Sequence, residues 1–162
     1  MFLAQQKELM VLDFYGLAFA LGLGRHCYTD MRFRLLYDST NCYLLVFGLV
    51  RAWQLMLWEQ AWQGMVVLGA LMLLIYYASR GGMGEGDVKL ALVLGLWLGV
   101  EQGLLCLLLA FTSGALLGGL LLLLRRVQRR TELPFGPFLC GSGLFSYVYG
   151  KEILAWYYQF CF

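Results

Sequence analysis

The sequence predicts an all-α membrane protein, and three observations support the prediction. Of the 162 residues, 61% are hydrophobic and 14% are charged, whereas about 25% are charged in a typical soluble domain. The apolar residues fall in blocks of about 15–22 residues, the length that crosses a ~30 Å hydrocarbon core as a helix. The connections between these blocks are short. We therefore expect a single integral-membrane domain over residues 1–162.

Six membrane-spanning helices are expected in this polytopic arrangement. The fourth block is short. No signal-peptide cleavage site follows the first block, so we expect the first block to be retained as a membrane span. The aromatic tail "ILAWYYQFCF" at 153–162 is expected to lie in the membrane interface or to extend the last helix. The expected spans are residues 11–28, 40–58, 61–79, 87–100, 103–124 and 135–150.

Basic residues cluster in alternate connections and predict the orientation. Because positively charged connections stay in the cytoplasm, we expect these three connections to be cytoplasmic and both termini to lie outside. Their arginines would contact lipid head groups. The three connections carry, in order, Arg25, Arg32 and Arg34; Arg80 and Lys89; and Arg125, Arg126, Arg129 and Arg130.

The remaining composition argues against several classes of partner. The five cysteines form no C-x-x-C pair and His26 is the single histidine, so the sequence favours neither a structural zinc site nor any other metal. A net charge of +2 is too small to indicate nucleic-acid binding. We expect neither a cofactor nor a nucleic-acid partner.

Two acids, Asp30 and Asp87, stand at the predicted cytoplasmic ends of helices. Acids at a membrane boundary indicate function by default, although each could also be a solvated loop or helix-capping carboxylate. A run of glycines precedes Asp87 and lets the backbone turn tightly and approach other segments closely. The phosphate-binding pattern G-x-x-x-x-G-K-[ST] is absent. The glycines of this run are Gly81, Gly82, Gly84 and Gly86.

Two carboxylates that meet at one depth share a proton, because both cannot ionise at close range. The ionised carboxylate can then activate a water molecule while the protonated one polarises a carbonyl group. This is the chemistry of an aspartic protease.

Three segments resemble the motifs of the bacterial type IV prepilin peptidases, which are GxGD aspartic proteases. They are "TDMRFRLLYDSTN" at 29–41, "GMGEGDVKLALVLGLWLG" at 82–99 and "LPFGPFLCGSG" at 133–143, in the order of that family. The resemblance implies the GxGD protease fold, with Asp30 and Asp87 as the catalytic aspartates. The two prolines of the third segment predict a stiff, non-helical entry to the last helix, which could equally be a simple boundary turn. The other motif and substrate-site residues implied are Gly84, Gly86, Lys89, Pro134, Phe135, Gly136 and Pro137.

The same resemblance implies an activity and a location. We expect cleavage of the leader of type IV prepilins or pseudopilins, after a glycine, at the cytoplasmic face of the bacterial inner membrane. Many members of that family carry an N-terminal domain with paired cysteines that is associated with methylation of the product. This chain has no C-x-x-C pair, so we expect the peptidase core alone.

Three alternatives remain open from the sequence. Asp38 could be the first aspartate, because "YD" at Tyr37–Asp38 resembles the presenilin group, although Asp38-Ser39-Thr40 fits a helix N-cap better. The chain could be a non-catalytic membrane subunit of a pilus or secretion machine. It could also be a proton or ion carrier that uses intramembrane acids.

Overall fold

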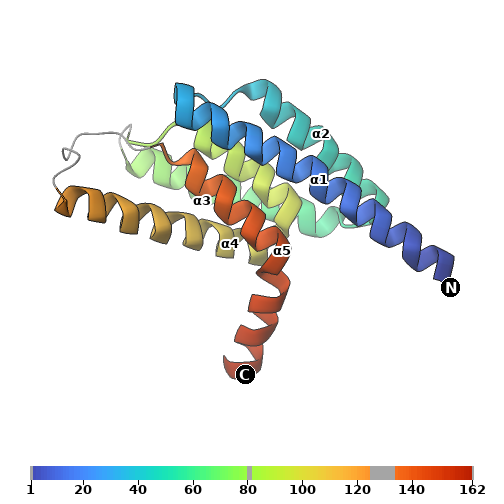
Figure 1. The fold of residues 1–162 in the computed structure, drawn as a ribbon. Coiled ribbons are helices and arrows are strands. Elements are labelled where there is room, and N and C mark those ends of the chain that lie inside the picture. Colours follow the sequence, from blue (N-terminus) through green and yellow to red (C-terminus); the bar gives the residue numbers. More distant parts are fainter. Residues whose placement is uncertain (1, 80–81, 125–133, 162) are drawn as a thin grey trace.

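A computed structural model describes residues 2–79, 82–124 and 134–161. Within these ranges the chain is helical with no β-strand, which confirms the all-α prediction. The basic residues Arg80, Arg125, Arg126, Arg129 and Arg130, and Gly81, lie outside the described residues. Figure 1 shows the helices as one bundle, with the N-terminus at the far end of α1 and the C-terminus at the end of α5. The helices are α1 (Phe2–Phe33), α2 (Asp38–Gln54), α3 (Trp58–Ala78), α4 (Glu85–Leu123) and α5 (Gly136–Cys161).

Helix α4 is two helices joined at a kink. Gly99 has φ 72° and ψ −171°, a conformation that residues with a Cβ rarely adopt. The second part doubles back along the bundle (Figure 1). The kink falls at the end of the predicted 87–100 block, so the two parts correspond to the separate blocks expected at 87–100 and 103–124.

Glycines allow α3 to pack tightly against both parts of α4. A Cβ placed on Gly64 or on Gly95 would overlap the backbone of the facing helix. On the other side of the kink, a Cβ on Gly103 would lie 2.6 Å from the Leu68 side chain. Close approach of this kind strengthens the van der Waals contact between apolar helices.

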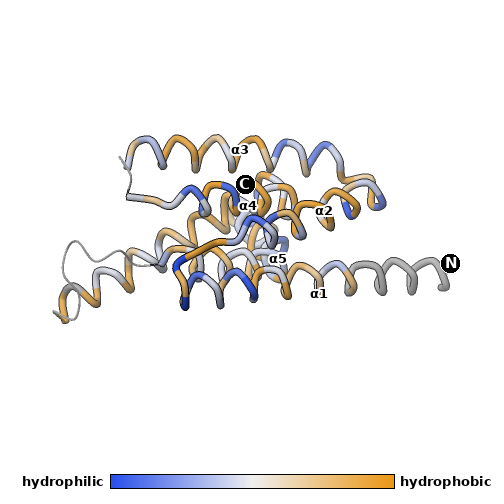
Figure 2. Tube along the Cα trace, turned by 90° about the horizontal axis from the view of Figure 1, so that it is seen from above, coloured by the Kyte–Doolittle hydropathy of each residue, from blue (hydrophilic) through white to orange (hydrophobic). Residues whose placement is uncertain are grey.

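Among the described residues, two helical segments are long and apolar enough to cross a membrane: Trp58–Ala78, with a mean hydropathy of 1.6, and Glu85–Leu121, which includes the Gly99 kink, with 2.2. Figure 2 shows hydrophobic residues along much of α3 and α4. The number of six crossings stays a prediction.

The core joins α1, α2, α4 and α5 around Trp97. The Trp97 indole stacks on the Phe19 ring with 4.6 Å between their centroids. Its Nε1–H donates a hydrogen bond of 2.9 Å to the Leu44 carbonyl of α2. Since Phe19 and Trp97 are both buried, this contact fixes α1 against the first part of α4.

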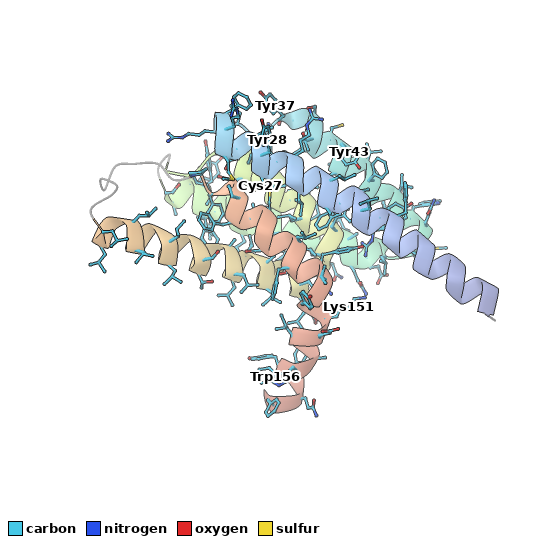
Figure 3. All side chains as sticks on the ribbon, viewed as in Figure 1. Cys27, Tyr28, Tyr37, Tyr43, Lys151 and Trp156 are labelled. Atoms are coloured by element: carbon cyan, nitrogen blue, oxygen red, sulfur yellow. The ribbon has the colours of Figure 1, made fainter. Side chains whose placement is uncertain are left out.

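Helix α5 continues well beyond the block predicted at 135–150. It reaches Cys161, so the aromatic tail extends the last helix. Figure 3 shows Lys151 where α5 leaves the other helices and Trp156 on the part that projects from them. Trp156 is 61% exposed, as expected for an aromatic side chain that meets lipid or the membrane interface.

Candidate active site

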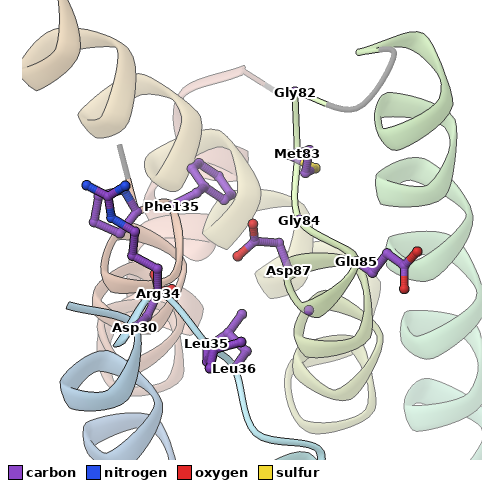
Figure 4. A pocket seen from close by; sticks show the side chains of 12 residues that line it. Asp30, Arg34, Leu35, Leu36, Gly82, Met83, Gly84, Glu85, Asp87 and Phe135 are labelled. Atoms are coloured by element: carbon purple, nitrogen blue, oxygen red, sulfur yellow. The ribbon is translucent and has the colours of Figure 1, made fainter. Parts of the chain in front are cut away.

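A cavity of about 530 Å³ lies at the end of the bundle where α1 ends and α4 begins. Asp30 and Asp87 both line it. In Figure 4 the Asp87 carboxylate points from α4 toward the wall formed by Asp30 and Arg34. The charge of Asp30 acts on Asp87, so the two carboxylates are close enough to interact. The helix ends thus bring together two acids that are far apart in the sequence.

Asp30 occupies the last turn of α1 and is 7% exposed. Its Oδ2 accepts a hydrogen bond of 3.0 Å from the backbone N–H of Gly136. Burial raises the pKa of the Asp30 carboxyl, while the Gly136 N–H and the Arg34 charge act to lower it. The N–H group and the cation both stabilise the ionised form of a carboxyl that is otherwise poorly solvated.

Gly136 is the first residue of α5, and its lack of a side chain permits this contact. A Cβ at this position would lie 2.5 Å from Asp30 Oδ2 and 2.9 Å from Asp30 Cγ. The free N–H groups at a helix N-terminus attract an anion. The P-F-G-P segment, predicted to be a stiff entry to the last helix, therefore also holds an acid of α1.

A left-handed turn at Arg34 follows Asp30. Arg34 has φ 53°, and its backbone N–H donates to the Asp30 carbonyl at 2.9 Å. A non-glycine residue in this conformation costs roughly 1–2 kcal/mol. The turn directs Leu35 and Leu36 along the cavity wall. Nothing in the local sequence marked this turn, because its residue is an arginine and not a glycine.

Asp87 lies in the first turn of α4, as the glycine run predicted, and is 8% exposed. Its backbone N–H donates a hydrogen bond of 3.2 Å to the Gly84 carbonyl, which closes the first turn of the helix. A Cβ on Gly86 would lie 2.9 Å from the Leu36 Cβ. Gly86 thus lets the α1–α2 connection approach the helix that carries Asp87.

Other charged residues of the motifs lie away from the acid pair. Glu85 reaches the lining of the cavity, but its carboxylate points away from Asp87 in Figure 4 and accepts a hydrogen bond of 3.2 Å from the Tyr76 hydroxyl. Lys89 does not line the cavity and forms a salt bridge of 2.8 Å with Asp38. The side chains of Lys89 and Asp38 are 53% and 74% exposed.

The expected role of Asp38 as an N-cap is wrong. Asp38 is the first residue of α2, Tyr37 occupies the N-cap position, and no side chain caps the helix. The nearby Lys89 ammonium attracts the Asp38 carboxylate instead. Asp38 is also absent from the cavity lining, so Asp30 is the acid that faces Asp87.

The remaining motif residues divide between two surfaces. Pro134 and Phe135 line the cavity with Gly84 and Gly86, whereas Pro137 lines a different recess. The Phe135 ring packs against Phe111 of α4 with centroids 5.0 Å apart. Among the described residues, no three His, Cys, Asp or Glu side chains are grouped as metal ligands would be.

Comparison with known proteins gives the family. The sequence profile of the Type IV leader peptidase family matches residues 17–119, a range that holds both Asp30 and Asp87. The chain belongs to this family.

Several curated relatives are named prepilin leader peptidase/N-methyltransferase. The protein of Legionella pneumophila is 34% identical over 137 residues, which cover 80% of this chain and 48% of the relative. That of Pseudomonas aeruginosa is 36% identical over 115 residues, covering 71% and 36% respectively. That of Bacillus subtilis is 31% identical over 133 residues, covering 80% and 53%. The chain thus spans about half the length of these relatives or less. No solved structure gives a significant match.

Proposed function

We propose that the chain is an aspartic endopeptidase of the bacterial inner membrane that removes the leader of type IV prepilins or pseudopilins. One observation carries the proposal: Asp30 and Asp87, both nearly buried, line the same cavity and interact through their charges. Membership of the Type IV leader peptidase family and the names of the relatives support the substrate class.

In the proposed reaction one carboxyl group of the pair is ionised and the other carries a proton. Asp30 is better placed to be ionised, because the Gly136 N–H and the Arg34 cation stabilise its negative charge. Asp30 then removes a proton from a water molecule, whose oxygen attacks the peptide carbonyl carbon, while Asp87 donates its proton to the carbonyl oxygen. When the tetrahedral intermediate collapses, the C–N bond breaks, Asp30 gives the proton that it took from water to the leaving amine, and Asp87 takes a proton back from a hydroxyl of the intermediate.

The position of the cavity supports a cytoplasmic site. Arg25, Arg32 and Arg34 lie on the same end of α1 as Asp30, and positively charged ends of membrane helices stay in the cytoplasm. A substrate with a basic leader and an apolar helix would keep its leader in the cytoplasmic solution. The peptide bond between the leader and the helix, directly after a glycine, would then lie at the end of the bundle that carries the cavity.

Cleavage of a co-expressed prepilin by the wild-type chain and three variants of it tests the proposal. Asp30→Asn and Asp87→Asn should each lower cleavage by about 100-fold or more, because each removes a proton-transfer group. Asp38→Asn is the matched control, since its side chain is exposed and outside the cavity. Cleavage that survives both Asp30→Asn and Asp87→Asn would instead indicate a non-catalytic membrane subunit.

A further inference from the structure

A recess of about 540 Å³ lies between the second part of α4 and the first turns of α5. We call it the α4–α5 groove. Its lining is mainly apolar and includes the open face of one glycine, Gly141, beside which no atom lies within 4 Å of an added Cβ. Its lining residues include Leu109, Thr112, Leu116, Phe138, Gly141 and Phe145.

The groove and the cavity share no lining residue, but they are lined by residues that are neighbours along the chain. Phe135 lines the cavity and packs on Phe111, and the next residue of α4, Thr112, lines the groove. On α5, Gly136 donates to Asp30 and the next residue, Pro137, lines the groove. Pro137 of the groove is therefore next in the chain to Gly136, whose N–H group holds Asp30.

Two polar groups of the groove, both on α4, are already satisfied by their own helix. The Thr112 hydroxyl donates to the Leu108 carbonyl at 2.7 Å, and the Ser113 hydroxyl donates to the Leu109 carbonyl at 2.6 Å. Hydroxyls bonded in this way add little polarity to a helix surface. Small residues beside large apolar ones are typical of surfaces on which another membrane helix packs.

We propose that the α4–α5 groove holds the apolar helix of the substrate, on the C-terminal side of the bond that is cut. This proposal rests on the proposed function and extends it to how the substrate is held. A helix in the groove begins beside Pro137, so the residues just before it extend into the cavity between Asp30 and Asp87. The leader then leaves the cavity toward solvent.

Filling the groove tests this placement. Gly141→Phe places a ring in the groove at a position where an added Cβ meets no atom within 4 Å. Gly119→Phe is a matched control, because an added Cβ at Gly119 also meets no atom within 4 Å and Gly119 does not line the groove. We expect Gly141→Phe to lower kcat/KM for a full-length prepilin about tenfold or more. Cleavage of a short peptide that ends before the apolar helix should be unchanged. Gly119→Phe should match the wild type on both substrates.

Photocrosslinking gives a second readout that does not depend on cleavage. In an inactive Asp87→Asn background, a photoreactive phenylalanine replacing Gly141 should crosslink to the apolar helix of the prepilin, and one replacing Gly119 should not. The placement would be overturned if both Phe variants cleaved the full-length prepilin equally well. It would also be overturned if position 141 crosslinked only to lipid or to a second copy of this chain. A wild type that cuts neither substrate would refute the proposed function instead.

Discussion

Two regions of the bundle place charged side chains out of water, and their surroundings differ. At the cavity, Asp30 and Asp87 face each other across space that a substrate and water can enter. At the kink of α4, Arg51 of α2 donates to the Trp97 carbonyl at 3.1 Å. Its guanidinium carbon also lies 5.6 Å from the centroid of the Trp97 ring and 5.8 Å from that of Tyr147.

The comparison sets the two buried acids, for which we propose a catalytic role, against a buried charge with a structural role. The break at Gly99 leaves the Trp97 carbonyl at the end of a helix, where a cation is favourable. Arg51 therefore has protein partners that fix its position. Asp30 has the Gly136 N–H and the Arg34 cation near it, but Asp87 lies opposite a second acid. A shared proton relieves the repulsion between two such carboxylates, and the proposed hydrolysis uses that state.

Apart from changes to the two acids themselves, Gly136→Ala should produce the largest effect at the cavity. The added Cβ overlaps Asp30 and separates it from the backbone N–H, and a hydrogen bond to a charged group contributes about 1.5–3 kcal/mol. We expect kcat for prepilin cleavage to fall about 10- to 100-fold with KM little changed. Gly119→Ala, with open space around it and outside both the cavity and the α4–α5 groove, is the control. An unchanged kcat would show that α5 does not position Asp30.

Arg51→Leu should affect stability and not chemistry. Loss of a charged hydrogen bond and of two cation–π contacts should lower the free energy of unfolding in detergent by about 1–3 kcal/mol. The pH profile of cleavage by the folded fraction should keep its shape, and Arg51→Lys should recover part of the stability. A shifted pH profile in Arg51→Leu would mean that the two regions are coupled.

Arg34→Gln should shift the pH dependence of cleavage. Arg34 lowers the pKa of Asp30, so removal of its charge raises that pKa. Because the pair titrates as a unit with one proton shared in the active state, both limbs of the pH–rate profile should move to higher pH. The profile of kcat/KM against pH measures this, with Arg34→Lys as the control that keeps the charge. Movement to lower pH would contradict the proposed charge state of Asp30.

The smallest effect should come from the salt bridge outside the cavity. Lys89→Met should leave cleavage within a factor of about two of the wild type, because exposed ion pairs contribute little. The charge-swapped pair Asp38→Lys with Lys89→Asp should behave in the same way. If Lys89→Met strongly lowered cleavage and the charge-swapped pair restored it, the salt bridge would position the helix that carries Asp87.

Local patterns were sufficient to predict the helical blocks and the position of Asp87 at the start of one of them. Hydropathy gave the helical blocks, and the glycine run placed Asp87 in a first helical turn, because such features depend on neighbouring residues. The contact between Gly136 and Asp30 joins residues 106 positions apart, and no periodicity encodes it. The N-cap expected at Asp38 was wrong for a similar reason, because Lys89 reaches it from another helix.

The kink at Gly99 also has a consequence for the surrounding lipid. From Glu85 to Leu98 the first part of α4 has 14 residues, which at ~1.5 Å per residue measure about 21 Å, against an apolar bilayer core of ~30 Å. A helix this short draws the bilayer surface inward. The thinned lipid would bring bulk water to Asp87 with no channel through the protein. Cleavage in proteoliposomes should then slow as acyl chains lengthen, and a rate independent of chain length would contradict local thinning at the site.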